Sequence, residues 1–366
     1  MKKLLWVLVV LIIVAFGGRA WYLHKQSVAE KDVVKIGALL PLTGPTARDG
    51  MDALAGMKIA LEEINRDPTS NTKIDIWVED NKFSVPASLA AFHKLNNSVP
   101  AFITFGAVPV NGLASLLKAN HKPTISLVNA EDATIYSTPE IFRAWISISK
   151  QAGVIAEFVT KNFKDSRIAF LKIKSIDGDS FENVLTTQLA GIGQELVAKE
   201  TFAVTDIETR NQVIKLLDKN PDVVVVYGFA QGYIAALNSL LEQGYKGAII
   251  TNQDVQMNHK LIANNAAGIY FGMPNYDFSK LIKSNPDLAD NLFAAFGYEG
   301  MRIMAKVIQQ NGTDSAKIRE GLANLKDFET GFGKISYDEQ GEIHLPNFVI
   351  KQMQADGSAK IVKESE

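Results

Sequence analysis

Short runs of β-branched residues alternate with segments of helical periodicity from Val33 onward. This alternation predicts an α/β protein, in which parallel sheets are covered by helices. In the first half we expect strands at 33–40, 74–78, 101–105 and 124–127. Helices are expected at 49–65, from Pro86 onward and at 111–119. Pro86 suits the first turn of its helix, because a backbone N–H at that position would have no partner within the helix.

A second array of the same kind follows the first. We expect helices at 151–162, 180–193, 210–219 and 233–242, and strands at 167–172, 196–202, 223–227 and 248–251. Gly244 is expected to end one helix in the left-handed conformation. An amphipathic segment at 288–310 stopping at Asn311-Gly312, a helix at 315–325 and strands at 334–336 and 347–353 complete the chain. The two arrays predict two domains of similar size.

The N-terminal segment has the layout of a secretory signal. Lys2 and Lys3 precede an apolar run from Leu4 to Gly18, and Arg19 follows it. The run is shorter than the ~20 apolar residues of a usual span. Because Trp21 and Tyr22 suit a membrane interface, an uncleaved anchor stays open as an alternative to cleavage. We therefore expect residues 1–30 to be a signal peptide or an N-terminal membrane anchor on an exported protein.

The composition of the 366 residues excludes several classes of function. With 38 Lys+Arg against 40 Asp+Glu the formal charge is -2, and no basic run suits a nucleic acid. There is no Cys and only five His, which excludes a thiolate nucleophile and Cys-ligated metals. The known motifs for hydrolases, phosphate loops and dinucleotide binding are missing, so we expect neither an enzyme nor a cofactor or metal. A hydrolase with Asp49 and Asp177 as an acid/base pair is kept as a rival.

Parallel sheets bind ligands beyond the carboxyl ends of their strands, so the loops there are the expected site. They are residues 41–50, 106–111 and 128–134 in the first array, and 174–180, 228–232 and 252–255 in the second. The helix N-termini behind these loops would point free N–H groups at a ligand, which suits a carboxylate.

The opening block Val34-Lys35-Ile36-Gly37-Ala38-Leu39-Leu40-Pro41-Leu42-Thr43-Gly44-Pro45, followed by Gly50 and by Ala60-Leu61-Glu62-Glu63-Ile64-Asn65, resembles a known family. It is similar to the start of the type I periplasmic solute-binding proteins related to the leucine/isoleucine/valine-binding protein. The similarity continues through Glu79-Asp80 with Pro86, Lys122-Pro123-Thr124-Ile125-Ser126, Phe142-Arg143, Tyr227-Gly228-Phe229 and Gly268-Ile269-Tyr270.

The resemblance implies two flavodoxin-like lobes joined by three hinge crossovers. It places residues 33–145 and 276–333 in the first lobe, and 146–275 and 334–366 in the second. The resemblance also implies a monomer in the periplasm, for which a membrane tether through Leu4 to Gly18 stays open. The two lobes would close on a small molecule, and the protein would deliver it to an ABC permease in the inner membrane. A membrane-tethered ligand sensor or partner-binding protein of the same fold is the alternative function.

The resemblance also implies where ligand contacts fall, and here the sequence departs from amino-acid binders of the family. The third loop, 107–111, lacks a hydroxyl, Ala130 replaces a Thr, and Gln253 takes the usual acidic position. Because a buried ammonium facing Gln253 would lose its charge partner, an ordinary α-amino acid is a less expected ligand. We expect ligand contacts from Arg48, Asp49, Val110, Asn111, Val128, Asn129, Ala130, Asp177, Phe229 and Gln253. Asp49 and Asp177 also have purely structural interpretations: Asp49 would cap its helix, and Asp177 would lie in a turn.

Overall fold

The computed structural model describes residues 32–364, apart from 71, 129–131, 146 and 346–347. The segment 1–30, for which we predict a signal peptide or anchor, lies outside the described residues. Within them, no helix combines the length and the apolar character needed to cross a bilayer.

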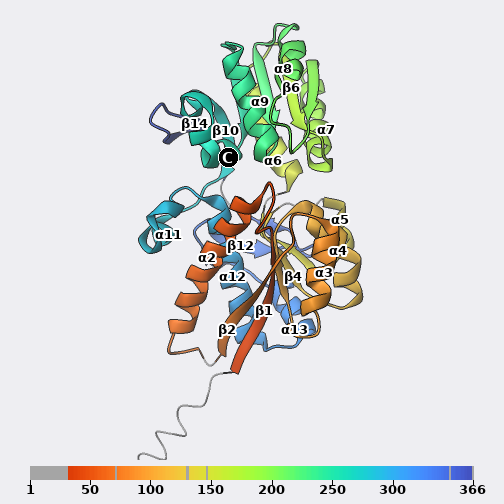
Figure 1. The fold of residues 1–366 in the computed structure, drawn as a ribbon, viewed down its shortest axis with the longest axis vertical. Helices are drawn as coiled ribbons and strands as arrows, with labels where there is room; N and C mark the ends of the chain where they lie inside the picture. Colours follow the sequence, from red (N-terminus) through yellow and green to blue (C-terminus); the bar gives the residue numbers. More distant parts are fainter. Residues whose placement is uncertain (1–31, 71, 129–131, 146, 346–347, 365–366) are drawn as a thin grey trace, which may run out of the picture.

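The first lobe is built on a parallel five-stranded sheet. Its strands are β1 (Asp32–Leu40), β2 (Thr72–Asp80), β3 (Phe102–Thr104), β4 (Thr124–Ser126) and β5 (Ile141–Arg143). Its helices are α2 (Ala47–Arg66), α3 (Val85–Leu95), α4 (Ala107–Ala119), α5 (Asp132–Ser137), α12 (Leu292–Asn311) and α13 (Ser315–Ala323). Figure 1 shows α12 and α13, from late in the chain, beside the early strands of this lobe.

The second lobe repeats the design and adds two strands. Five parallel strands, β6 (Ile168–Ile173), β7 (Leu196–Phe202), β8 (Val223–Tyr227), β9 (Ala248–Asn252) and β10 (Tyr270–Pro274), are extended by antiparallel β14 (Phe348–Met353) and β15 (Ala359–Glu364). The helices are α6 (Ile148–Asn162), α7 (Ile176–Ala190), α8 (Arg210–Leu217), α9 (Ala230–Glu242) and α10 (Asp254–Asn258), followed by the short 3₁₀ helices η1 (His259–Leu261) and η2 (Ala263–Ala266). All five residues of β8, Val-Val-Val-Val-Tyr, are buried, as a central parallel strand requires.

Both sheets have the same strand order, and that order locates the site. It is β2-β1-β3-β4-β5 in the first lobe and β7-β6-β8-β9-β10 in the second. Each is the flavodoxin-like order 2-1-3-4-5, with a crevice beyond the carboxyl ends of the strands where the winding direction reverses. The predicted α/β class and the two flavodoxin-like lobes are confirmed.

The chain passes between the lobes after β5, after β10 and before β14. Between the last two passages lie α11 (Ser279–Ser284), η3 (Pro286–Leu288) and a three-stranded antiparallel sheet of β11 (Phe328–Thr330), β12 (Gly333–Tyr337) and β13 (Ile343–His344). This small sheet touches the first lobe: Arg143 Nη2 lies 2.8 Å from Glu342 Oε2, and the rings of Phe142 and Tyr337 are 5.3 Å apart.

Helices α2 and α12 cross at two glycines that face each other's backbone. A Cβ on Gly56 would come within 1.9 Å of the Ala294 carbonyl oxygen, and one on Gly297 within 2.0 Å of the Ala53 carbonyl oxygen. Only hydrogen in place of a side chain permits this approach, because real Cβ contacts do not fall below about 3 Å. The crossing therefore fixes how the late helix completes the first lobe.

Most of the predicted helices and strands are present. Some helices begin or end at other residues than predicted, because the capping residues differ from those expected. Gly244, two residues beyond α9, has a φ of 73°, as predicted, and α12 ends at Asn311 before Gly312, where we expected it to stop. Helix α2 begins at Ala47 instead of at 49, with Thr46 as its N-cap, so Asp49 lies inside the first turn and does not cap. Strands β5, β10, β11, β13 and β15 and helices α5, α10 and α11 were not predicted, because each is short or lacks clear periodicity.

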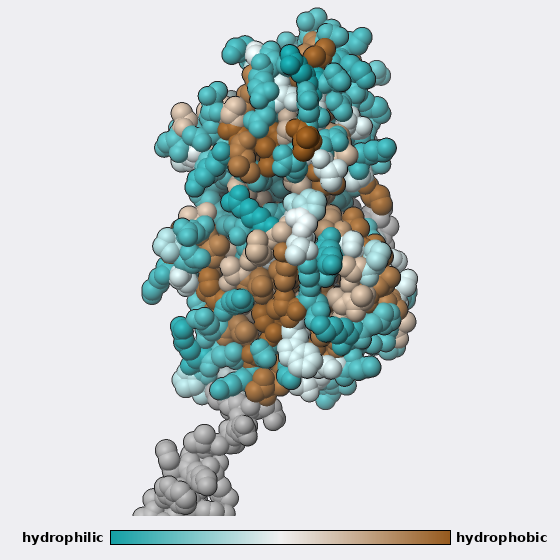
Figure 2. Space-filling model, viewed as in Figure 1, coloured by the Kyte–Doolittle hydropathy of each residue, from teal (hydrophilic) through white to brown (hydrophobic). Residues whose placement is uncertain are grey.

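Hydrophilic residues cover most of the second lobe in the view of Figure 2. In the first lobe, hydrophobic residues gather over β1 and β2, between α2 and α3. Strand β2 lies at the edge of its sheet, and Ile76, Trp77 and Val78 on it are only partly buried.

Candidate ligand-binding site

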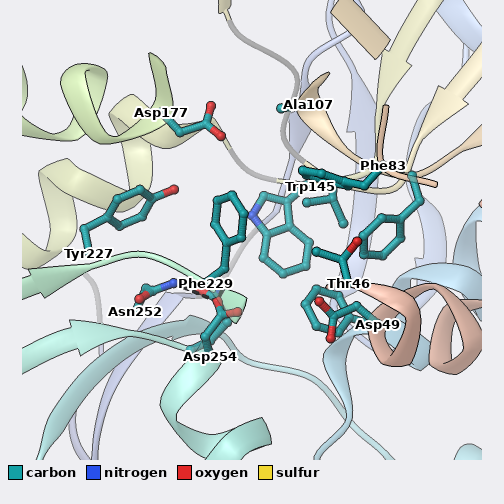
Figure 3. A pocket seen from close by; sticks show the side chains of 14 residues that line it. Thr46, Asp49, Phe83, Ala107, Trp145, Asp177, Tyr227, Phe229, Asn252 and Asp254 are labelled. Carbon is teal, nitrogen blue, oxygen red and sulfur yellow. Dashed lines mark hydrogen bonds between the residues drawn. The ribbon is translucent and has the colours of Figure 1, made fainter. Parts of the chain in front are cut away.

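A cavity of about 50 Å³, partly open to solvent, lies where the carboxyl ends of the two parallel sheets face each other. Its walls come from both lobes, as Figure 3 shows. The lining residues are Thr46, Asp49, Phe83, Phe105, Ala107, Val128, Trp145, Asp177, Tyr227, Phe229, Asn252, Gln253, Asp254 and Phe293. This is the location that the strand order predicts.

The start of α2 supplies two polar groups on the first-lobe side. Thr46 is 3% exposed, and although it is the N-cap residue its side chain makes no capping hydrogen bond. Its hydroxyl oxygen has no partner among the described residues. One turn further, burial and the nearby Asp52 carboxylate raise the pKa of Asp49 to about 7, against the smaller opposing effect of Arg48. Asp49 is therefore poised to change charge near neutral pH.

The loop between β2 and α3 carries Phe83 into the cavity on an unusual backbone. Lys82 and Phe83 both have positive φ, 51° and 50°, which is a costly conformation for bulky residues. The fully buried Asn81 holds it: Asn81 Oδ1 accepts from the Phe83 N–H at 2.9 Å, and Nδ2 donates to the carbonyls of Leu39 and Phe105. Three hydrogen bonds of Asn81 therefore hold the loop that positions the Phe83 ring.

Phe83 meets Phe229 of the second lobe across the cavity. Their ring centroids are 6.1 Å apart at 67°, an edge-to-face arrangement. Phe229 also borders a strained residue, since Ala230, the first residue of α9, has a φ of 59°. Left-handed backbone thus stands beside both rings, a feature that clusters at functional sites.

On the second-lobe side, the end of β9 presents a carboxyl group held by amides. Asp254 is 4% exposed, and its Oδ2 accepts from Asn252 Nδ2 at 2.7 Å and from Gln253 Nε2 at 2.8 Å. Gln253 in turn accepts a hydrogen bond from Gln151. Burial first, and the Asp49 carboxylate second, raise the pKa of Asp254 well above its usual range. Asp49 and Asp254, from opposite lobes, therefore interact electrostatically across the cavity.

Asp177 and Tyr227 form the third polar group. Asp177 lies in the first turn of α7, whose start is capped by Ser175 accepting from the Gly178 N–H at 3.1 Å. Tyr227 ends β8 and stacks on Phe181, with centroids 4.5 Å apart. Burial, with the carboxylates of Asp177 and Asp254 adding to it, raises the pKa of Tyr227 well above its usual range. Tyr227 is thus a protonated hydroxyl at working pH.

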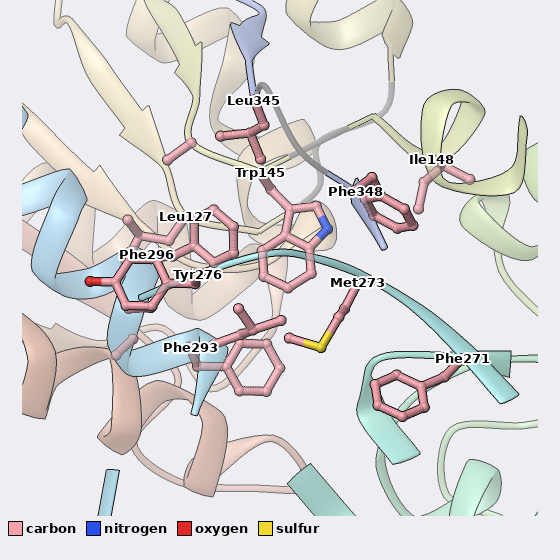
Figure 4. Packing of buried hydrophobic residues seen from close by; sticks show 14 of the residues in the cluster. Leu127, Trp145, Ile148, Phe271, Met273, Tyr276, Phe293, Phe296, Leu345 and Phe348 are labelled. Carbon is pink, nitrogen blue, oxygen red and sulfur yellow. The ribbon is translucent and has the colours of Figure 1, made fainter. Parts of the chain in front are cut away.

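The floor of the cavity is aromatic and belongs to the region where the lobes join. Trp145 lies 6.0 Å from Phe293 in a stacked arrangement and 4.4 Å from Phe296, and Phe105 contacts Phe293 edge to face. Figure 4 shows Trp145, Met273, Leu345 and Phe348, which lie at the three passages between the lobes, in one apolar cluster. A change in the orientation of the lobes would therefore move the residues that line the cavity.

The structure brings together Asp49, Val128, Asp177, Phe229 and Gln253 of the predicted contact residues. Arg48 does not line the cavity, because it is exposed and points toward Asp52, 4.0 Å away. Val110 and Asn111 do not line it either: the expected loop at 107–111 is the first turn of α4, and Val110 is fully buried in a core cluster. Asn129 and Ala130 lie outside the described residues.

One acidic residue of the cavity, Asp254, was not among the predicted contacts. An ammonium near Gln253 was expected to lack a charge partner, but the neighbouring Asp254 also lines the cavity and accepts a hydrogen bond from Gln253. Thr46, Phe83, Phe105, Ala107, Trp145 and Phe293 were not predicted at the site. A signal existed for Thr46, which directly precedes the first helix, but none for Phe83, whose direction depends on Asn81.

Among the residues that the structure describes, no group of three or more His, Cys, Asp or Glu is arranged to hold a metal ion. The polar lining consists of carboxyl, amide and hydroxyl groups beside aromatic rings. Such a lining can hydrogen-bond and enclose a small polar molecule.

A family model described as periplasmic binding protein matches residues 33–358. The Leu/Ile/Val-binding protein homolog 1 of Brucella suis is 23% identical, with 96% of each chain covered. A branched-chain amino acid transporter substrate-binding protein of Streptococcus pneumoniae, solved with isoleucine, is 20% identical over 91% of this chain and 100% of that chain, with a TM-score of 0.79. A solute-binding protein of Rhodopseudomonas palustris, solved with 4-hydroxybenzoate, is 17% identical over 92% and 97%, with a TM-score of 0.83.

Proposed function

The chain belongs to the periplasmic binding protein family, and from this membership we propose that it captures a small polar molecule between its lobes outside the cytoplasm. The observation that carries the proposal is the cavity itself, which is lined from both lobes at the carboxyl ends of two parallel sheets. A ligand that contacts both walls favours the closed arrangement, because closure is stabilised only by contacts that the open form lacks.

We further propose that the protein delivers its ligand to an ABC permease in the inner membrane, acts as a monomer in the periplasm and leaves the ligand chemically unchanged. Proteins similar to it are named as amino-acid-binding and transporter substrate-binding proteins, which supports delivery and binding over hydrolysis. The apolar run from Leu4 to Gly18 supports export.

The division into lobes is also proposed. Residues 33–145 and 276–333 belong to the first lobe in this scheme, and we extend the second of these segments to about residue 344. The reason is that β12 and β13 contact the first lobe through Arg143 with Glu342 and Phe142 with Tyr337. The second lobe then comprises 146–275 and the chain from β14 onward.

A tethered ligand sensor on the same fold is the second candidate. Two observations favour it: the N-terminal apolar run followed by Trp21 and Tyr22, and the absence of a hydroxyl at Ala107, which lines the cavity. An intact N-terminus on the protein isolated from cells would support the tether, whereas a chain starting at Trp21 or Glu30 would contradict it.

Native mass spectrometry of the protein purified from its producing cells tests the binding proposal. We expect a stoichiometric small molecule that is released on mild denaturation and that raises the melting temperature when added back, since a ligand that binds only the native form stabilises it by mass action. A protein that carries nothing, and whose melting temperature ignores a broad metabolite library, would contradict the proposal.

A further inference from the structure

We propose that the ligand is a small organic cation, an ammonium group on an apolar body without a carboxylate, held between Asp49 of the first lobe and Asp254 of the second. This inference deepens the proposed function and rests on it. It is carried by the charge of the lining, an unpaired hydroxyl, the aromatic walls and the placement of the two carboxyl groups.

The lining carries acidic groups and no basic ones among the described residues. Asp49, Asp177 and Asp254 all line the cavity, while no Lys, Arg or His does. Each of these acids lies in the first turn of a helix, α2, α7 or α10. The partial positive charge of those helix starts is thus already met by the protein's own carboxyl groups, and is not left for an anionic ligand.

A buried hydroxyl without a partner marks a place for a ligand atom. Thr46 Oγ1 lines the cavity and makes no hydrogen bond to any described residue, although Thr46 is 3% exposed. An unpaired buried polar group costs free energy, so such groups nearly always have a partner. The hydroxyl oxygen can accept from an ammonium N–H one turn away from Asp49, on the same helix.

Aromatic rings supply the remaining walls. Phe83 and Phe229 meet edge to face from the two lobes, and Trp145, Tyr227 and Phe293 close other sides. Ring faces attract cations through their quadrupole and also bury the apolar body of an amine. Aromatic rings next to carboxyl groups are therefore suited to an organic ammonium and poorly suited to a free carboxylate.

The positions of Asp49 and Asp254 explain why closure would need a cation. They stand on opposite lobes in Figure 3 and raise each other's energy when both are ionised. Two carboxylates brought together in a cleft of low water content repel, and each also loses hydration. One ammonium between them reverses the sign of the interaction, and only in the closed arrangement can it contact both.

Matched ligand pairs test the inference by calorimetry on the purified protein at pH 8. The pairs are 3-methylbutylamine against leucine and 2-phenylethylamine against phenylalanine, with 3-phenylpropanoate as the anion. We expect the amine of each pair to bind about 100-fold more tightly than its amino acid, because an unpaired buried carboxylate carries a penalty of that order, and the anion not to bind.

Tighter binding of leucine, phenylalanine or the anion would overturn the cation assignment and leave the solute-binding role standing. If no compound binds and none is released from the purified protein, the solute-binding role itself is contradicted, and the cation with it. The two failures are therefore distinguishable.

Isosteric variants locate the charge. Asp254→Asn and Asp49→Asn should each weaken amine binding by about 100-fold, since each removes one carboxylate from the pair. Glu62→Gln is the control, because it removes an exposed acid from the same helix α2, where its partner is Arg66. Retained amine affinity in both aspartate variants with an unchanged melting temperature would overturn the assignment. Because Asp49 accepts no described hydrogen bond from another side chain, its variant keeps the test valid if Asp254→Asn does not fold.

Discussion

Asn81 shows how one buried side chain can set the shape of a binding wall. Its amide makes three hydrogen bonds, two to the carbonyls of Leu39 and Phe105 and one from the Phe83 N–H. These bonds connect the ends of β1 and β3 to the loop that carries Phe83. They offset the cost of two successive residues with positive φ.

Asn81→Ala should lower the free energy of unfolding by about 2–4 kcal/mol, because it removes the three hydrogen bonds of a fully buried amide. Urea denaturation followed by circular dichroism measures this. Lys82→Gly is the control in the same loop: glycine accepts the φ of 51° at Lys82 without strain, so stability should stay unchanged or rise. Equal stability of Asn81→Ala and the unmodified protein would contradict this account of the loop.

At the residue scale, the sequence located the site loops better than the individual contacts. Asp49, Asp177 and Phe229 were predictable because they lie in the loops or first helical turns after β1, β6 and β8, and such positions reach the crevice in this fold. Val110 was wrong because Ala107 and the residues after it continue into α4, which turns Val110 toward the core. The importance of Asp254 over Gln253 depended on a side-chain hydrogen bond, which spacing does not reveal.

At the scale of elements, the crossing of α2 and α12 depends on two glycines. Because Gly56 faces the backbone of Ala294 and Gly297 that of Ala53, the helices approach more closely than any side chain would allow. Helix periodicity predicted both helices, but the contact between them joins segments more than 200 residues apart. The hydrophobic pattern within either helix does not predict that α2 and α12 pack against each other.

Gly56→Ala should destabilise the protein by about 1–3 kcal/mol, since the added methyl group forces the two helices apart. Gly153→Ala is a matched control inside helix α6, where the nearest atom to an added Cβ is Gln188 Nε2 at 3.7 Å. This control should stabilise by about 0.5–1 kcal/mol through helix propensity alone. Thermal unfolding of both variants tests the pair, and a stabilising Gly56→Ala would contradict the crossing.

At the scale of the whole molecule, the pKa of Asp49 links protonation to the approach of the lobes. Asp52 and Arg48 act on it from its own helix, and Asp254 faces it from the second lobe. Its pKa is raised from 3.8 to about 7, so the folded protein holds a proton that the unfolded chain releases between these values. The contribution of Asp49 to stability is therefore present at low pH and is lost as pH rises through 7.

The unliganded protein should accordingly melt at a lower temperature at pH 8 than at pH 5, and Asp49→Asn should reduce this dependence because an amide does not titrate. Differential scanning fluorimetry of both proteins across this range measures the difference. The affinity for an ammonium ligand should change in the opposite direction and rise with pH, because the ionised carboxylate is the form that binds it. Identical pH profiles for the two proteins would refute the role given to Asp49.

The pairing of α2 with α12 also determines when the first lobe can fold. In a chain that emerges from the N-terminus, strands β1 to β5 and helix α2 exist long before residues 292–311 arrive to cover them. The apolar face of α2, with Gly56, stays without its partner until nearly the whole chain is available. Because the second lobe is mostly inserted between these two segments, its core can form first. The order of segments thus postpones completion of the N-terminal lobe, which would keep that part of the chain loosely structured during the export that we propose.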